Sequence, residues 1–172
     1  MKLYLVRHGE TDANAGGIVQ GWLDTSLNEK GFAQAAQVAN EFNEGIDVVY
    51  SSDLMRAAQT AAEFRKKYAN VPYLEDARLR ERNFGDATAN HRDEYDWEQF
   101  WSLDDRVTIP NAEVLTDFTA RIMAFLDELK RQQYESVLIV THGGVLNRIQ
   151  YILDPSHKYQ PHKNASILEV DI

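Results

Sequence analysis

Residues 136–153 read SVLIVTHGGVLNRIQYIL, and the pattern within them indicates the fold class. Residues 136–140 form a short apolar run that is typical of a buried strand, and the residues from Gly143 onward are predicted to form a helix. A second run of this kind, at residues 2–6, is apolar and stops at Gly9, which favours a buried parallel strand. Short apolar strands alternating with helices indicate an α/β domain.

The remaining elements follow the same alternation. Residues 28–42 predict a helix with Asn28 as its N-cap. A strand is expected at 47–50, a helix at 54–68 with caps offered by residues 51–53, and an extended piece at 72–74. Residues 112–132 predict a long amphipathic helix, and 166–172 an edge strand. The buried stripe of the 112–132 helix comprises Val114, Phe118, Ile122, Phe125, Leu126 and Leu129. The order predicts a three-layer α/β/α sandwich with a mostly parallel sheet.

Composition limits the classes of partner. The 172 residues fit one domain, 1–172, and the net charge of −9 argues against a general binder of nucleic acid or of anionic membranes. The absence of cysteine excludes a disulfide scaffold and a thiol nucleophile. Because the apolar run near the start is too short for a signal peptide or a membrane span, we expect a cytoplasmic protein. The oligomeric state is left open.

Residues 86–110 do not follow the strand–helix alternation. The segment is polar and acidic, and it contains Tyr95, Trp97, Phe100 and Trp101. We predict a short cap-like excursion over the active site, in which the aromatic rings either pack the segment onto the domain or form a substrate wall.

Candidate chemistry lies where three predicted strands end. Arg7 and His8 follow the first strand, residues 51–53 with Arg56 follow the second, and His142 with Gly143 follows the strand at 136–140. Ligands of open α/β sheets bind beyond the carboxyl ends of the strands. The fold is therefore expected to gather two histidines and two arginines at one edge.

These residue types suit phosphoryl transfer. An arginine grips two phosphate oxygens at once, and amide groups at a helix N-terminus attract anions. A neutral imidazole between two guanidinium groups resists protonation and keeps one nitrogen free to attack phosphorus. Glu81 is the candidate acid for the leaving oxygen, because a nearby phosphate dianion raises the pKa of a carboxyl group.

Four motifs in order resemble the histidine phosphatase superfamily, which includes the phosphoglycerate mutases. They are RHGET at 7–11, YSSDLMRAAQTA at 50–61, LRERNFG at 79–85 and VTHGGV at 140–145. NASI at 164–167 resembles the usual entry to the final strand, and residues 24–34 resemble the first helix of the family. The resemblance spans nearly the whole chain and implies a phosphoglycerate mutase-like fold.

The resemblance also implies roles for individual residues. His8 takes the phosphoryl group, while Arg7, Arg56 and His142 hold its oxygens. Glu81 protonates the leaving group and later activates water. Asn14 matches a position in the phosphate pocket and Gln20 one near the substrate. The family's chemistry needs no metal, and no cofactor is expected. The expected partner is a small phosphorylated metabolite.

The candidate residues are compatible with three activities. Hydrolysis of phosphomonoesters leads, with a mutase and a non-catalytic phosphate-binding module as alternatives. Residues 110–114 and 86–88 depart from sequences common in the family. We also expect no clear counterpart, between Asp86 and Pro110, of the basic residues with which mutases grip a sugar-acid phosphate.

Two minor expectations concern surface residues. His91, His157 and His162 are predicted to lie on the surface. If the excursion covers the pocket, its acids should disfavour substrates with extra negative charge; otherwise they only keep the segment soluble. These acids are Asp93, Glu94, Asp96, Glu98, Asp104 and Asp105.

Overall fold

The chain folds around one five-stranded sheet. The computed structural model describes residues 1–101 and 109–172, so Asp104 and Asp105 lie outside the described residues. The strands are β1 (Lys2–Arg7), β2 (Val48–Ser51), β3 (Tyr73–Glu75), β4 (Ser136–Thr141) and β5 (Ile167–Asp171). They lie in the order β3-β2-β4-β1-β5. All neighbouring pairs are parallel except β1 and β5, which makes β5 an antiparallel edge strand as predicted.

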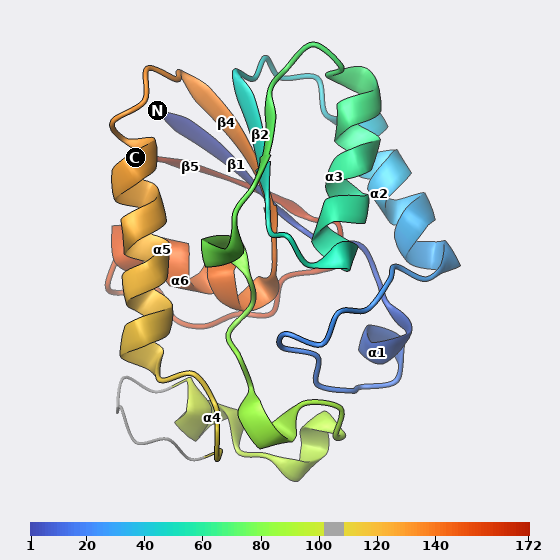
Figure 1. Ribbon diagram of the computed structural model, residues 1–172, viewed down its shortest axis with the longest axis vertical. Coiled ribbons are helices and arrows are strands. Elements are labelled where there is room, and N and C mark those ends of the chain that lie inside the picture. Colours follow the sequence, from blue (N-terminus) through green and yellow to red (C-terminus); the bar gives the residue numbers. More distant parts are fainter. Residues whose placement is uncertain (102–108) are drawn as a thin grey trace.

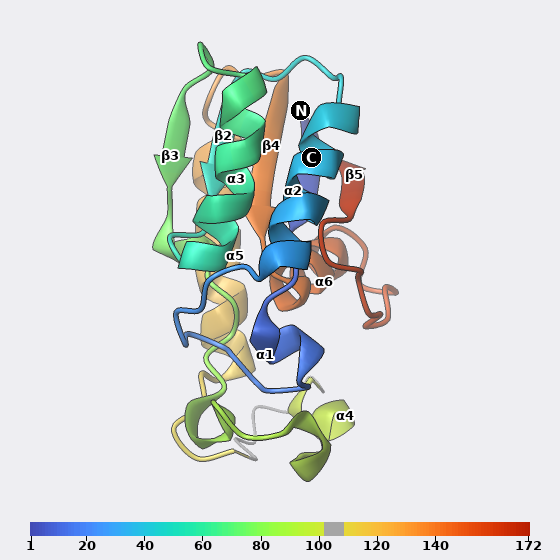
Figure 2. The same ribbon diagram turned by 90° about the vertical axis from the view of Figure 1, so that its right-hand side faces the viewer.

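Helices cover both faces of the sheet (Figures 1 and 2). α2 (Glu29–Glu41) and α3 (Met55–Lys67) pack on one face, and α5 (Leu115–Leu129) and α6 (Gly143–Leu153) on the other. The predicted three-layer α/β/α architecture is confirmed. No described helix is both long and apolar enough to cross a lipid bilayer.

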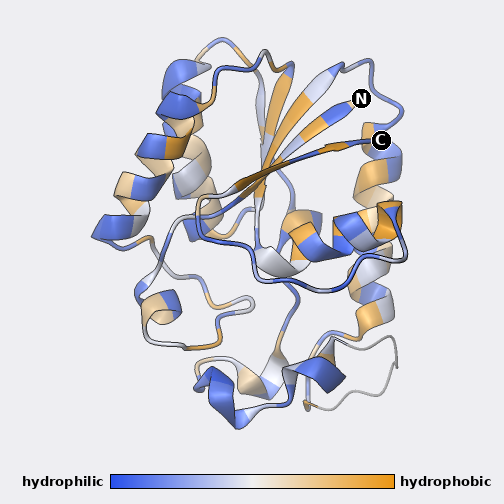
Figure 3. Cartoon of the chain, turned by 180° about the vertical axis from the view of Figure 1, so that it is seen from behind, coloured by the Kyte–Doolittle hydropathy of each residue, from blue (hydrophilic) through white to orange (hydrophobic). Residues whose placement is uncertain are grey.

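The two core clusters explain why the inner strands are apolar throughout. Leu3, Leu5 and Ile139 pack toward α5 and α6, while Val6 and Val140 pack toward α2 and α3. A strand that is buried on both faces has no polar side to alternate. Figure 3 shows the sheet as a largely hydrophobic layer between helices whose hydropathy alternates.

Two helix starts differ from the sequence prediction. α5 begins at Leu115, three residues after the predicted start, and Leu115 is buried while Val114 is only half-buried. At α3, the predicted caps contribute through Ser52, whose Oγ accepts from the Leu54 amide at 3.3 Å. The Met55 amide donates at 2.7 Å to Asp24, a residue from a distant segment that no local pattern would reveal.

Short elements gather beyond the carboxyl ends of β1, β2 and β4 (Figure 1). They are α1 (Asp12–Ala15), η1 (Ala77–Leu79), η2 (Gly85–Ala87), η3 (Arg92–Glu94) and α4 (Trp97–Phe100). The excursion has a small core of its own, built on Val19, Ala87, Phe100 and Ile109. It is tied to the loop after α1 by a bridge between Ile18 and His91 and by the Arg92 amide, which donates to Gly17 O at 2.9 Å.

Candidate active site

The sheet brings both histidines together. Arg7 pairs with Thr141 at the ends of β1 and β4, so the next residues of the two strands, His8 and His142, lie side by side. The His8 amide donates to Thr141 O at 2.9 Å, and the two imidazole centroids are 5.1 Å apart. The convergence expected from the sequence is therefore present.

The loop after β1 holds His8 in one orientation. The Gly9 amide donates to Thr60 Oγ1 at 3.0 Å. Gly9 also lies so near α2 that a Cβ atom on it would stand 2.5 Å from Gly31 O, which leaves room only for glycine. His8 Nδ1 is 2.7 Å from Gly9 O. Because a carbonyl oxygen only accepts, Nδ1 carries the hydrogen and Nε2 keeps its lone pair.

The environment keeps His8 neutral. Burial, followed by the charges of Arg56 and Arg7, holds the pKa of His8 well below its ordinary value. The side chain is 3 % exposed and lines a cavity. A neutral imidazole with a free nitrogen at the wall of a cavity is the form that a nucleophile requires.

His142 lies behind the cavity wall. It is fully buried, it is not among the described residues that line the cavity, and its Nε2 is 2.9 Å from Ser52 Oγ. Burial, and after it the charges of Arg56 and of His8, lowers the pKa of His142 well below its usual value. Its Nδ1 has no hydrogen-bond partner within the described ranges. If Ser52 donates to Nε2, Nδ1 carries a hydrogen that is free to bind an oxygen.

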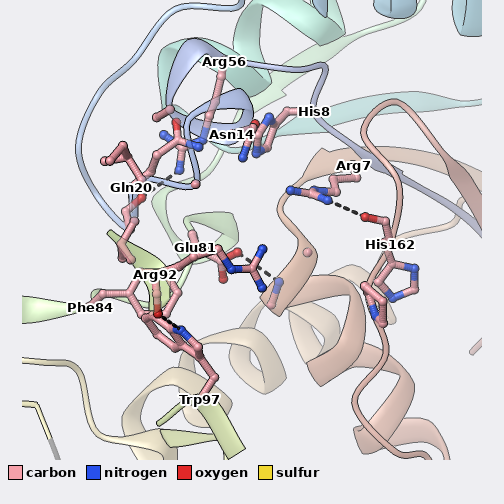
Figure 4. Close-up of a pocket in the computed structure, with 18 of the residues that line it drawn as sticks. Arg7, His8, Asn14, Gln20, Arg56, Glu81, Phe84, Arg92, Trp97 and His162 are labelled. Atoms are coloured by element: carbon pink, nitrogen blue, oxygen red, sulfur yellow. Dashed lines mark hydrogen bonds between the residues drawn. The ribbon is translucent and has the colours of Figure 1, made fainter. Parts of the chain in front are cut away.

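The two predicted arginines line the cavity, and both also hold main chain. Arg7 Nη1 donates to His162 O (Figure 4). Arg56 is 1 % exposed and donates to Gly21 O at 2.7 Å and to Leu23 O at 2.8 Å. Burial lowers the pKa of Arg56 to about 10, so its charge persists at neutral pH. Arg56 therefore fixes the 21–23 loop in addition to presenting a cation.

Glu81 occupies the N-terminus of α6. Its Oε2 accepts from the Gly144 amide at 3.0 Å and its Oε1 from the Arg82 amide at 2.9 Å. The sequence indicated that amides at the start of this helix attract an anion; in the structure the Gly144 amide binds the carboxylate of the candidate acid. Arg80 pairs with Asp53 and not with Glu81.

A residue that sequence reasoning missed holds the backbone of Glu81. Arg121, on α5, donates to Glu81 O at 2.8 Å and to Arg80 O at 2.7 Å, and it forms an ion pair with Glu113 at 2.7 Å. Glu81 lies in irregular chain, so these contacts replace the support that a helix or strand would give. Arg121 falls within the helix predicted at residues 112–132, and nothing in the sequence indicated that it would contact residue 81.

Asn14 and Gln20 line the cavity as predicted. Asn14 Oδ1 accepts from the Thr11 amide at 3.2 Å, and Gln20 Oε1 accepts from Thr11 Oγ1 at 3.0 Å and from Thr25. Their carbonyl oxygens are thereby satisfied, which leaves the amide nitrogens as donors for a ligand.

The cavity has a volume of about 260 Å³. Gly143 also lines it, on the opening turn of α6. In the view of Figure 4, Glu81 lies between His8 and the rings of Phe84 and Trp97. Trp101 and Tyr159 complete an aromatic wall, stacked with centroids 5.2 Å apart. Phe100 is buried in the core of the excursion, as the packing role predicts, while Trp97 and Trp101 line the cavity, where a substrate wall would lie.

Two side chains lie otherwise than the sequence suggested. Arg92 belongs to the excursion and lines the cavity, so a basic side chain does face the cavity there. His162, expected at the surface, is half-buried and also lines the cavity. Both depend on how long loops turn, which no periodic pattern encodes. None of the excursion's described acids lines the cavity.

Among residues 1–101 and 109–172, no group of three or more histidine or acidic side chains lies close enough to hold a metal ion.

Comparisons with known proteins agree with this geometry. The chain is 33 % identical to the metal-independent phosphoserine phosphatase of Arabidopsis thaliana, over 96 % of this chain and 74 % of that protein. The solved mycobacterial glucosyl-3-phosphoglycerate phosphatase superposes with a TM-score of 0.86 at 29 % identity, covering 99 % of this chain and 92 % of the other. Phosphoglycerate mutase from Thermus thermophilus superposes with a TM-score of 0.80 at 30 % identity, covering 99 % and 93 %.

The mutase-like fold and the assignment to a phosphatase family are thereby confirmed. The pattern that describes the histidine phosphatase superfamily, branch 1, matches residues 3–172. The four motifs singled out in the sequence fall within that range. The chain belongs to the histidine phosphatase superfamily.

Proposed function

We propose that the protein hydrolyses small phosphomonoesters in two steps through a phosphohistidine on His8. The observation that carries this proposal is the state of His8. Its Nδ1–H is bound to Gly9 O, its Nε2 is left with a lone pair, and its ring lines a cavity shared with Arg7 and Arg56. A small metabolite is proposed as the substrate because the cavity holds only about 260 Å³.

In the first step, His8 Nε2 forms a bond to phosphorus as the bond from phosphorus to the leaving oxygen breaks. Glu81, protonated beside the phosphate dianion, gives its proton to that oxygen and releases an alcohol. Arg7 and Arg56 stabilise the charge on the transferring oxygens. A contact from His142 Nδ1 requires that its ring, which is fully buried in this structure, become exposed to the cavity. Asn14, Gln20 and the Gly143 amide complete the donors around the phosphoryl group.

In the second step, water attacks the phosphohistidine. Glu81, now a carboxylate, takes the proton of the attacking water while the bond from phosphorus to Nε2 breaks. Inorganic phosphate leaves, and both His8 and Glu81 return to their starting protonation states. The cycle consumes one water and needs no metal or cofactor.

The test is turnover of p-nitrophenyl phosphate by the wild type and by His8→Ala. We expect His8→Ala to be inactive, and rapid quenching of the wild type in base to trap a phosphoenzyme that acid destroys. His91→Ala is the matched control, because His91 is exposed and lies outside the cavity wall. Turnover retained by His8→Ala would disprove the assignment of the nucleophile.

A mutase is the second candidate, and Arg92 is the observation that favours it. A cation on the wall formed by the excursion offers a place for the second charged group of a phosphorylated acid. Supplying 3-phosphoglycerate and measuring isomerisation against phosphate release separates the two activities. We expect release to exceed isomerisation. If the protein were a non-catalytic phosphate-binding module, the free nitrogen of His8 would have no function.

Two organisational proposals accompany the activity. Residues 1–172 are proposed to act as one phosphatase domain with 86–110 as its cap, since the cavity is lined by both. A cytoplasmic location is proposed, supported by the absence of cysteine, and cell fractionation tests it. The net charge of −9 supports a protein that does not bind nucleic acid.

A further inference from the structure

A second cavity lies behind the aromatic wall of the first. Its volume is about 340 Å³, and it shares Trp101, Gly144 and Tyr159 with the active-site cavity. Its other described walls come from α6 and from the chain that follows it: Asn147, Arg148, Tyr151, Pro155, Ser156, His157 and Lys158. The proposed phosphoryl transfer uses none of these seven residues.

Arg148 is the unusual feature of this second cavity. It is 7 % exposed, yet within the described ranges its guanidinium forms neither a hydrogen bond nor an ion pair, and its buried Nε has no partner. Its Cζ lies 5.0 Å from the centroid of the Tyr151 ring, which attracts the charge but accepts no ordinary hydrogen bond. Burial lowers the pKa of Arg148.

A buried cation without a partner destabilises a fold, because the water it has lost is not replaced. Natural proteins almost never bury an arginine fully unless it is paired. A guanidinium that is largely buried, has no hydrogen-bond partner and lines a cavity therefore has its Nη donors available for a planar or tetrahedral oxyanion.

The other charged side chain that lines this cavity is also positive. It is Lys158, and no acidic side chain lines the cavity in the described part of the chain. The nearby Asp154 is occupied by Ser156, at 2.7 Å from its hydroxyl group. This excess of positive charge stands out in a chain whose net charge is −9.

Asn147 holds the loop that carries Lys158. Its Oδ1 accepts from the Gln160 amide at 2.9 Å and from His157 Nε2 at 3.2 Å, and its Nδ2 donates to Gln160 O at 2.9 Å. The site is thus preorganised on α6, the helix that also carries Gly144 beside Glu81.

We propose that Arg148 and Lys158 form a second oxyanion-binding site, separated from the reacting groups only by the Trp101–Tyr159 wall. The oxyanion is a carboxylate or phosphate. It comes either from the far end of a bound substrate or from free inorganic phosphate. The binding half of this proposal does not depend on the proposed function, whereas the substrate half does.

The first experiment is calorimetric titration with inorganic phosphate. The wild type should bind two phosphates per chain, Arg148→Met only the one held by Arg7, and Arg7→Met only the one held by Arg148. Loss of charged hydrogen bonds should weaken the second site about tenfold or more in Arg148→Met. Lys130→Met, at the far end of α5, is the control of equal charge change and should bind like the wild type.

The second experiment compares two esters, one with a distal carboxylate and p-nitrophenyl phosphate, which has none. If the oxyanion is part of the substrate, the ratio of their kcat/KM values should fall about tenfold in Arg148→Met and recover in Arg148→Lys. If only the titration changes, the ligand is free phosphate. If neither ester is hydrolysed by any variant, the proposed function fails while the titration still decides this site.

The site is rejected if Arg148→Met matches the wild type in both the titration and the ratio. Should Arg148→Met fail to fold, Lys158→Met takes its place, since Lys158 is exposed. It should weaken the second phosphate about threefold, and an unchanged titration would again reject the site.

Discussion

The contact between Glu81 and Gly144 makes a sharp prediction for Gly144→Ala. A Cβ atom built on Gly144 would lie 2.7 Å from Trp101 Cη2 and 3.0 Å from Glu81 Cδ, with Glu81 Oε1 nearer still. Carbon atoms pack at about 3.5–4.0 Å, so the carboxyl group and the ring must each move by about 1 Å. Both obstacles are side-chain ends, so we expect the fold to survive.

A shift of about 1 Å in a positioned catalytic group costs about 100-fold in rate, which is about 2.7 kcal/mol of activation free energy. The loss in kcat/KM should be largest for an alkyl phosphate, whose leaving group needs a proton, and smaller for p-nitrophenyl phosphate. The assay is therefore kcat/KM on both esters, with thermal unfolding to confirm the fold.

Gly143→Ala is the matched control. The nearest heavy atom to a Cβ on Gly143 is Arg7 Nε at 3.6 Å, an ordinary contact, so activity should stay within a few-fold of the wild type. Equal losses in both variants would mean that the helix N-terminus matters as a whole. Unchanged activity of Gly144→Ala toward the alkyl ester would refute the role of Glu81 as the acid.

Two further predictions concern charge. The pKa values of His8 and His142 are lowered in the folded state, so between those values and about 6.5 the unfolded chain binds more protons, and stability should fall as the pH decreases through that window. Urea unfolding at several pH values should show a slope of up to about 1.4 kcal/mol per pH unit for each histidine, and His142→Gln should reduce it. Arg92→Met should raise KM severalfold for esters with a second negative charge but not for p-nitrophenyl phosphate. The control is Arg131→Met, far from the cavity, which should change KM for neither ester. Equal effects of Arg92→Met on both esters would show that Arg92 only supports the loop.

The fold was predictable where burial imposes a period on the sequence. The inner strands are apolar on both faces, and α6 was predicted with its observed ends because a glycine pair closely follows the strand, with only His142 between them. α5 shows the limit, since Val114 fits the stripe as well as Leu115 does, and only the packing against the core decides between them. The cap that Asp24 supplies to α3 is a tertiary contact that no local pattern contains.

The candidate site divides in the same way. Arg7 ends β1 and pairs with Thr141 at the end of β4, and His8 and His142 follow those strands directly, so their meeting is a consequence of the parallel register. Arg92, His162 and Arg121 reach the site through loop paths or across a helix interface, and nothing in their spacing reveals a destination. The parts of the site built on the sheet could be predicted, and the parts contributed by loops could not.

The stacked pair Trp101 and Tyr159 separates two hollows that would otherwise be continuous. Neither ring hydrogen-bonds to a reacting group, and both lie in segments outside the regular layers of the fold. Exchange of one ring for a small side chain would turn the compact chamber into a longer trench while leaving the imidazole and guanidinium groups in place. A substitution at one of these two positions would thus admit larger substrates without changing the residues that break the ester bond.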